Sequence, residues 1–392
     1  MNKITVISLV LALPYCINAM SELKEKEEVS SALETKINGY RRELLSQYLI
    51  PDLAKLVEEY DPIKDKWKCE TKLEDDNIYT HVYSLPGNKI ASVSTDYVIK
   101  IWDLTSGICR TLEGHTDKIN SICVLPGNKL ASGSADHTIR IWDLASGRFK
   151  ILEGHSGAVN SVCRLSENKL VSGSEDGTVK IWNHNSYKCE ATLHIHSNIR
   201  SICALSRNKF AFGCDDGTIR IWNISSSKYE ATLKDHTEGV HSICVLPGNK
   251  LASGSFDETI KIWDLALPVE ASAKSGSGKC KTLEGHTYVV TSICVLPGNK
   301  LASGSMDHTI KIWDIISGKC EATLKGHFNE VNSLCVTSEN KLVSGSKDGI
   351  IKIWSNSAIS SDFVDEEYIK FMAEKESWIT TKKQEKSGCI IN

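Results

Sequence analysis

The sequence has little net charge and lacks the motifs that mark the common catalytic sites. Its 46 lysines and arginines nearly balance 49 aspartates and glutamates, giving a formal charge of −3 at pH 7. This balance gives no electrostatic reason to expect nucleic acid as a partner. There is no glycine-rich phosphate loop, no His-Glu-x-x-His and no nucleophile elbow. We therefore expect a non-enzymatic protein without a cofactor.

Helical periodicity is missing from the central part of the chain, where short alternating runs stand between turns. Ile119 to Leu125 alternates as a strand does, Pro126-Gly127-Asn128 turns the chain, and TIRIWD (138–143) is β-branched and aromatic. Tryptophan recurs about every 40 residues, and once after 50, at Trp102, Trp142, Trp182, Trp222, Trp263, Trp313 and Trp354. Units of this size, each with four short strands, must stack on one another to bury their faces.

Two dipeptides recur in these units. Trp-Asp stands at 102–103, 142–143, 263–264 and 313–314, and Gly-His at 114–115, 154–155, 285–286 and 326–327. In these features the chain resembles the WD-repeat family of β-propellers over about residues 67–357. The resemblance implies an all-β fold, a seven-bladed β-propeller with short helical N- and C-terminal flanks.

Residues 67–73 have the sequence pattern of an outer strand but stand before the first full repeat. Outer strands read KCEATL at 188–193, KYEATL at 228–233 and KCEATL at 319–324. WKCETKL (67–73) reads the same way but precedes the first full repeat, whereas the last repeat ends at Trp354 with no outer strand following. We predict that 67–73 closes the ring as the outer strand of the last blade.

Each repeat also offers Ser, His and Asp, which invites comparison with a catalytic triad. The family resemblance implies instead a structural chain in each blade, from Trp to Ser to His to Asp. An enzyme needs one such site, and a buried polar chain stabilises only when every member is satisfied. The sets are His115, Ser132, Asp136 and Trp142; His155, Ser172, Asp176 and Trp182; His236, Ser253, Asp257 and Trp263; His286, Ser303, Asp307 and Trp313; and His327, Ser344, Asp348 and Trp354.

Two repeats depart from this pattern. The first has Asp76 where His is expected, and the fourth keeps His196 but has Phe212 in place of Ser. We predict that these two blades are less stable than the others. A cluster in the same region, His184, Cys189, His194 and His196, matches no zinc-binding spacing, so we expect no metal.

Because the repeats are nearly identical, the positions at which they differ are informative about function. By the family resemblance, these positions lie on one rim of the disc, around the central channel, where such propellers bind peptides or partner domains. Drift in exposed loops is the alternative. We expect a monomeric propeller that binds protein or peptide partners within a complex, through Lys118, Asn120, Arg200, His241, Phe256, Tyr288, Met306, Phe328 and Lys347.

Fourteen cysteines would be enough for a disulfide framework, but their placement argues against one. Six of them occupy the same repeat position and therefore lie a whole unit apart, too far to bridge. We expect these to be small buried hydrophobic residues: Cys123, Cys163, Cys203, Cys244, Cys294 and Cys335.

The N-terminal flank has two parts. Residues 1–19 carry Lys3, an apolar run and a small-residue end, which predicts a secretory signal peptide and export; an apolar helix on a cytoplasmic protein is the alternative. Residues 20–66 are helical in composition. Within them, 40–60 faintly resembles the opening of an F-box, so an alternative function is that of a substrate receptor for a ubiquitin ligase. A helix packed on the propeller is the simpler interpretation.

The C-terminal flank, 358–392, is expected to be a helical and polar tail. It ends Cys389-Ile390-Ile391-Asn392, which is similar to a prenylation box apart from its last residue. Lipidated Cys389 would bring the protein to a membrane. A signal peptide and prenylation are compatible only for a protein exported by one cell and modified in another, such as a secreted effector in the cytosol or at the membrane of a host cell.

Overall fold

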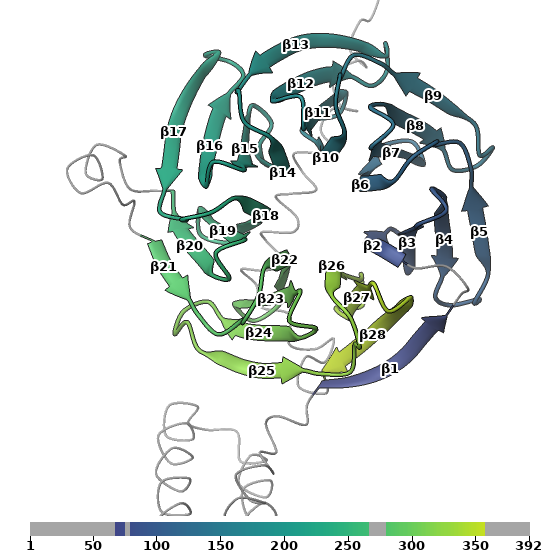
Figure 1. Ribbon diagram of the computed structural model, residues 1–392. Coiled ribbons are helices and arrows are strands. Elements are labelled where there is room, and N and C mark those ends of the chain that lie inside the picture. Colours follow the sequence, from purple (N-terminus) through teal and green to yellow (C-terminus); the bar gives the residue numbers. More distant parts are fainter. Residues whose placement is uncertain (1–66, 75–78, 266–279, 357–392) are drawn as a thin grey trace, which may run out of the picture. The chain divides into compact units, whose positions relative to one another are not determined.

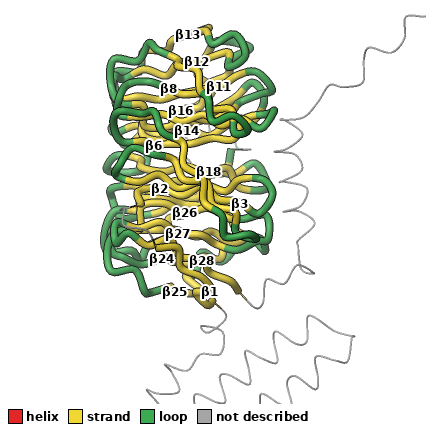
Figure 2. Tube along the Cα trace, turned by 90° about the vertical axis from the view of Figure 1, so that its right-hand side faces the viewer, coloured by secondary structure: helices red, strands yellow, loops and turns green. Residues whose placement is uncertain are grey.

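Seven four-stranded antiparallel sheets surround a central channel (Figure 1). The computed structural model describes residues 67–74, 79–265 and 280–356. Within these ranges there is no helix, and loops project from the strands on two faces of the ring (Figure 2). The predicted all-β, seven-bladed propeller is confirmed, and the predicted helical flanks lie outside the described residues.

The strands follow one another from the channel to the edge of each blade. Blade 1 contains β2 (Tyr79–Leu85), β3 (Lys89–Ser94), β4 (Ile99–Asp103) and β5 (Cys109–Leu112). Blades 2 and 3 contain β6 (Ile119–Leu125), β7 (Lys129–Ser134), β8 (Ile139–Asp143), β9 (Phe149–Leu152), β10 (Val159–Arg164), β11 (Lys169–Ser174), β12 (Thr178–Asn183) and β13 (Lys188–His194). Blades 4 and 5 contain β14 (Ile199–Ser206), β15 (Lys209–Cys214), β16 (Thr218–Asn223), β17 (Lys228–Lys234), β18 (Val240–Leu246), β19 (Lys250–Ser255), β20 (Ile260–Asp264) and β21 (Cys280–Leu283). Blade 6 contains β22 (Val290–Leu296), β23 (Lys300–Ser305), β24 (Ile310–Asp314) and β25 (Cys320–Leu324); blade 7 contains β26 (Val331–Val336), β27 (Leu342–Ser346), β28 (Ile350–Asn356) and, as its outer strand, β1 (Trp67–Glu74).

The core lies between neighbouring sheets. In most blades the second strand consists largely of small residues, as in KLASGS of β7, because both of its faces are covered. The exception is β15 of blade 4, which carries Phe210 and Phe212. A Cβ added to Gly133 of β7 would lie 2.6 Å from Val159 in the next blade, so only glycine allows this approach. One blade's Val93 and Leu112 pack with the next blade's Trp142 in a shared cluster. Each blade therefore completes the core of its neighbour.

Serines of the innermost strands bond one blade to the next. Ser121 Oγ accepts the backbone N–H of Val162 at 3.1 Å, and the same bond joins Ser161 to Ile202, Ser201 to Ile243, Ser242 to Ile293 and Ser292 to Leu334. At the next junction Ser333 Oγ donates to the carbonyl of Val82, at 3.0 Å. In blade 1 this position is His81, and Tyr83 Oη donates to the carbonyl of Asn120 at 3.1 Å instead. The junction of blades 1 and 2 is thus built differently from the other six.

The ring is closed by the first described strand. β1 pairs antiparallel with β28, with Leu73 opposite Ile351, so the segment predicted to close the ring occupies the outer position of blade 7. Figure 1 shows β1 leaving blade 7 towards blade 1. Both ends of the propeller sequence therefore meet in one sheet.

Two kinds of outer strand occur. Four outer strands carry a β-bulge: β1, β13, β17 and β25. In each of them the extra residue is a glutamate. This glutamate forms an ion pair with a lysine at the start of the second strand of the same blade, or just before it. These pairs are Glu70–Lys341, Glu190–Lys169, Glu230–Lys209 and Glu321–Lys300. β5, β9 and β21 pair without a bulge and lack the glutamate. Blades 1, 2 and 5 are therefore more basic at this edge.

Candidate functional site

The predicted partner-binding positions come together on one face because of a repeated backbone hydrogen bond. In blade 2 the N–H of Ala135, in the turn after the second strand, donates to the carbonyl of Lys118, just before the innermost strand, at 2.7 Å. The equivalent bonds join Glu175 to Ala158, Asp215 to Asn198, Phe256 to Gly239, Met306 to Val289, and Lys347 to Glu330. We call these loops and turns the channel rim. The channel rim thus contains a variable pair of residues from each of six blades.

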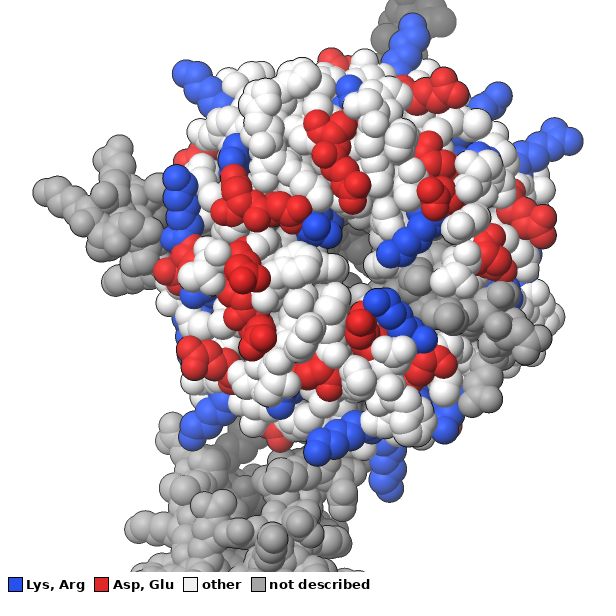
Figure 3. Space-filling model, viewed as in Figure 1, with Lys and Arg blue, Asp and Glu red and all other residues white. Residues whose placement is uncertain are grey.

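A cavity of about 550 Å³ occupies the channel at this rim. Side chains of all seven innermost strands line it, including His81, Asn120, Asn160, Arg200, His241 and Thr291. Figure 3 shows one face of the propeller, where basic and acidic side chains border the hollow at the centre of the ring. The cavity is therefore polar, as suits a peptide backbone and charged side chains better than an apolar cofactor.

Three predicted residues from two blades form a stack at the channel. The guanidinium of Arg200, in β14, lies over the ring of Phe256 at 5.0 Å, and His241, in β18, packs on the same ring at 5.4 Å between centroids. Asp215 pairs with Arg200 through both of its carboxylate oxygens, one of them 3.1 Å from Nη2. We call Arg200, Phe256 and His241 the rim stack. Its side chains are held in place before any partner arrives.

The other predicted rim residues have separate environments. Asn120 Nδ2 donates to the carbonyl of Val159 at 3.3 Å and therefore ties two blades together at the channel. Tyr288 is 57% exposed and Phe328 81% exposed, in the loops before β22 and β26. Met306 is half-buried, and Lys118 and Lys347 are exposed, with Lys347 paired to Glu330 at 2.5 Å.

His241 is held as a neutral imidazole. Burial lowers its pKa to about 4, and the positive charge of Arg200 acts in the same direction. Its Nδ1 lies 2.8 Å from the carbonyl of Thr291, so Nδ1 carries the proton and donates it. Nε2 is consequently the acceptor, on a side chain that lines the cavity. His81, whose pKa is lowered by burial to about 3, is a second neutral imidazole in the same lining.

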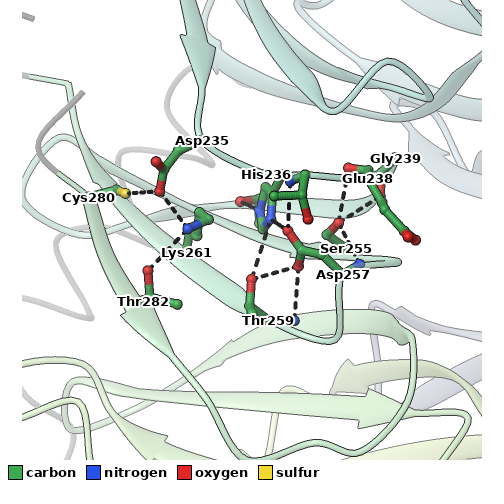
Figure 4. A network of polar contacts seen from close by, with 12 residues as sticks. Asp235, His236, Glu238, Gly239, Ser255, Asp257, Thr259, Lys261, Cys280 and Thr282 are labelled. Atoms are coloured by element: carbon green, nitrogen blue, oxygen red, sulfur yellow. Dashed lines mark hydrogen bonds and ion pairs between the residues drawn. The ribbon is translucent and has the colours of Figure 1, made fainter. Parts of the chain in front are cut away.

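The predicted structural sets are hydrogen-bonded chains in five blades. In blade 5 Trp263 Nε1 donates to Ser253 Oγ at 2.8 Å, Ser253 Oγ lies 2.7 Å from His236 Nε2, and His236 Nδ1 lies 2.7 Å from Asp257. Figure 4 shows His236 against Asp257, with Thr259 on the same carboxylate and Ser255 bonded to the loop at Glu238 and Gly239. The same three bonds recur, at 2.6–2.8 Å, from Trp142, Trp182, Trp313 and Trp354.

In all five chains the pKa of the aspartate is lowered, which keeps the carboxylate ionised. Burial alone would raise the pKa of Asp176, but hydrogen bonds from Thr178, the N–H of Ser156 and His155 outweigh it and lower the pKa to about 2. Burial lowers the pKa of His155. The serines of the five sets are 0% exposed, so no substrate reaches their hydroxyls: Ser132, Ser172, Ser253, Ser303 and Ser344. These residues join strands and do not form triads open to a substrate.

The two divergent blades replace the chain in different ways. In blade 1 Trp102 Nε1 still donates to Ser92 Oγ at 2.8 Å, whereas Asp76 lies outside the described residues. In blade 4 Phe212 is fully buried, and Asp216 is paired with Arg220 at 2.7 Å rather than with His196. An aromatic ring thus fills the space of the polar chain.

The sequence predicts no metal site at the cluster of His184, Cys189, His194 and His196. No group of three or more His, Cys, Asp or Glu residues in the described ranges is placed to hold a metal ion. His184, from the cluster noted above, is 1% exposed, and burial lowers its pKa. Cys189 lies exposed on β13. No helix in the described part of the chain is long and apolar enough to cross a membrane.

Sequence reasoning missed part of the channel lining. Thr291 and Asn332 occupy in blades 6 and 7 the position that Asn120 has in blade 2, and His81 and Tyr83 line the channel in blade 1. Aligning each copy on its Ser-apolar-Cys triplet would have found Thr291 and Asn332. The blade 1 residues carry neither Ser nor Cys, so the triplet does not reveal them.

Several predictions concern parts of the chain outside the described residues. These are the signal peptide (1–19), the F-box-like segment (40–60) within the N-terminal flank, the tail (358–392) and lipidation at Cys389. They stay predictions, and with them export and recruitment of a ubiquitin ligase.

Comparison with known proteins points to a single family. A family model described as the WD domain, G-beta repeat, matches residues 107–143, 147–183, 187–223, 227–264, 277–314 and 318–355, which together exceed half of the chain. Nuclear distribution protein nudF 1 of Talaromyces marneffei is 31% identical over 103 residues, 23% of this chain and 22% of that protein, so the match spans about a fifth of the relative. The crystal structure of the WD40 β-propeller domain of Doa1 superposes with a TM-score of 0.66 at 24% identity, covering 75% of this chain and 99% of that one. The last likeness shows the fold alone.

Proposed function

Because this chain belongs to the WD40-repeat family of β-propellers, we propose that it is a non-enzymatic platform whose channel rim binds partner proteins or peptides. Members of the family commonly mediate protein–protein interactions. The observation that carries the proposal is the rim stack, in which Arg200, Phe256 and His241 from two adjacent blades are packed on one another beside a polar cavity.

The rim stack has the composition and order of a binding hot spot. Arginine and aromatic residues dominate the energy of protein interfaces. Phe256 is fixed between Arg200 and His241, and Asp215 holds Arg200 from the other side. A partner would therefore lose little side-chain entropy at this point, because the side chains are ordered in advance.

The surroundings of the stack suit a segment that enters the channel. His241 Nε2 offers an acceptor to an N–H or O–H of the partner, and Lys118 and Arg200, which line the cavity, offer donors to its carbonyls or carboxylates. Tyr288 and Phe328 add exposed aromatic surface on the blades that follow. We infer that the partner inserts a polar segment and rests apolar side chains on the rim.

The test is a pull-down with the full chain from lysate beside two matched variants. In the rim variant, Phe256, Tyr288 and Met306 are changed to alanine. In the control, three apolar residues that lie off the rim and are at least one-third exposed are changed: Tyr187, Tyr229 and Ile316. Circular dichroism first establishes that all three proteins are folded.

We expect a partner that the wild-type chain and the control capture and the rim variant loses. Equal capture by all three proteins would contradict binding at the rim. A single change, Arg200→Ala, then asks whether the rim stack itself is the anchor, and we expect at least a tenfold weaker complex.

A further inference from the structure

The turns that lead into the outer strands lie on the face of the ring opposite the channel rim. In blade 2, β8 starts after the rim turn at Ala135 and ends at Asp143, where the chain turns into β9. There the N–H of Asp143 donates to the carbonyl of Arg148, the residue before β9, at 2.8 Å. Loops project from both faces of the ring (Figure 2), and the position of Arg148 recurs on this second face in the other blades.

A basic side chain occupies this recurring position in five blades. We call these residues the outer bases: Lys68, Arg148, Lys188, Lys228 and Lys319. All five are exposed. In blade 1 the position is held by Ile108, whose carbonyl accepts the N–H of Asp103 at 2.9 Å. Equivalent residues of similar blades lie at the same level along the axis of a ring, so the five positive charges surround the axis in one plane.

Carboxylates of the same face do not balance the outer bases. Within the described ranges, no ion pair involves any of these five side chains. The carboxylates near them interact with other cations instead, in the pairs Glu70–Lys341, Glu190–Lys169, Glu230–Lys209, Glu321–Lys300, Asp103–Lys89, Asp143–Lys129, Asp314–Lys281 and Glu167–Arg164. Asp264 lies opposite Lys250 in its sheet. The outer bases are therefore a surplus of positive charge on this face.

Exposed apolar and aromatic side chains stand among these charges. Ile108 is 66% exposed and Ile316 72% exposed, in the turns before β5 and β25. Tyr187 and Tyr229 are 36% and 45% exposed, and each is the neighbour in sequence of an outer base. Lysine and arginine beside isoleucine and tyrosine is the composition of surfaces that rest in the headgroup region of a bilayer. This face thus combines the two features that hold a protein on a membrane without spanning it.

We propose that this face binds the surface of a membrane that contains anionic phospholipids. The outer bases lie over the headgroups, and Ile108 and Ile316 enter the interfacial region. At physiological salt a charge acts over about 8 Å, so the charge of the nearest face matters more than the charge of the whole chain. A flat surface meets all five blades at once, whereas a nucleic acid duplex would follow one line across the ring. The channel rim faces away from the membrane and stays free for a partner protein.

The test is co-flotation of the full chain with vesicles of phosphatidylcholine containing about one quarter phosphatidylserine, beside vesicles of phosphatidylcholine alone. Cys389→Ser is present in every protein, so that lipidation of this residue contributes nothing. The face variant carries Lys228→Glu and Lys319→Glu. The control carries the same change of charge at the rim ends of the same two outer strands, β17 and β25, where Lys234 and Lys325 are also exposed: Lys234→Glu and Lys325→Glu.

We expect the parent chain to float with the anionic vesicles only. Its apparent affinity should fall at least tenfold in the face variant, stay within about twofold in the control, and weaken as salt is raised. Circular dichroism first establishes that the variants are folded. Equal flotation of all three proteins would overturn the proposal, and so would equal flotation with both kinds of vesicle.

The apolar contribution is tested at constant charge. Ile108→Ser with Ile316→Ser should weaken flotation at least fivefold, because less apolar surface enters the interface. Tyr97→Ser is the control, at a tyrosine 38% exposed in the turn between β3 and β4 on the rim side, and should have no effect. Equal flotation of these two variants would contradict insertion of the isoleucines.

A competition decides between a membrane and a nucleic acid. Duplex DNA of random sequence is added to the vesicle-bound chain at a phosphate concentration equal to that of phosphatidylserine. We expect the chain to stay on the vesicles. Release by DNA, together with DNA binding that the face variant loses, would assign the outer bases to a nucleic acid and overturn the proposal.

Discussion

Lys341 Nζ lies 3.0 Å from Glu70 Oε2, so an ion pair joins the last blade to the strand that opens the propeller sequence. The same pair in blades 3, 4 and 6 is made within one continuous repeat. β1 therefore reproduces an ordinary outer strand down to its bulge, although it comes from the other end of the sequence.

Ring closure should depend on the apolar contacts of β1 far more than on this ion pair. Trp67 packs against the cluster that contains Trp354, and Leu73 packs against that of Val343 and Ile351. We expect Trp67→Ala with Leu73→Ala to lower the free energy of unfolding by about 2–4 kcal/mol. Glu70→Gln should cost less than about 0.5 kcal/mol, because both partners are part-exposed. Urea unfolding measures both, and comparable losses would contradict this ranking.

A structural serine should matter more than an exposed one. Ser172→Ala leaves the indole N–H of Trp182 and Nε2 of His155 buried without their partner. We expect a loss of about 1–3 kcal/mol in the free energy of unfolding. Ser186→Ala, in an exposed turn of the same blade, is the control and should stay within about 0.5 kcal/mol of the wild type. Equal effects would show that the polar chain is not stabilising.

Blade 4 should open more readily than blade 3. Its second strand has Phe212 in place of the serine, and Trp222 is part-exposed, whereas Trp182 of blade 3 is 1% exposed. Hydrogen exchange followed by mass spectrometry should therefore show faster exchange in β15 and β16 than in β11 and β12. Equal protection would mean that the buried ring of Phe212 fully compensates for the missing bonds.

Stability should fall as the pH drops from about 6.5 to 4, in part through His241. The unfolded chain takes up a proton at this histidine near pH 6.5, but the folded protein does so only near its lowered pKa of about 4. The unfolded state thus binds more protons throughout this window, which costs up to about 3 kcal/mol of stability. His241→Gln should make the pH dependence correspondingly shallower. Titration of the His241 ring by NMR checks the cause, and a midpoint near 6.5 would refute it.

Thiol reactivity should divide the cysteines by position. Cys69, Cys109, Cys189 and Cys320 are exposed on outer strands. On the innermost strands, burial raises the pKa of thiols such as Cys123, Cys294 and Cys335 well above the ordinary value. Site-resolved iodoacetamide labelling at pH 8 should modify the outer set at least tenfold faster. Rapid modification of Cys123 in folded protein would contradict this.

The architecture could be predicted because the same pattern of strands and turns recurs in all seven copies of the repeat. The place of residues 67–73 followed from a missing strand at one end and a surplus one at the other. The rim stack could not be predicted from the sequence. Packing of Phe256 on Arg200 depends on the distance and orientation between two neighbouring blades, and the sequence of one repeat does not determine these. Likewise, no Ser-apolar-Cys triplet marks the innermost strand of the first repeat, and only the pairing of β2 with β3 places His81 at the position of the serines.

The pairing of β1 with β28 also sets an order of events on the ribosome. Leu73 is synthesised early, yet its partner Ile351 follows roughly 280 residues later, which at about 5–20 residues per second is a delay of tens of seconds. During this interval the nascent chain carries an unpaired strand and an incomplete ring with two open edges. Completion of the fold is therefore a late step. β28 leaves the ribosome with the last repeat and must then pair with β1, which left it long before.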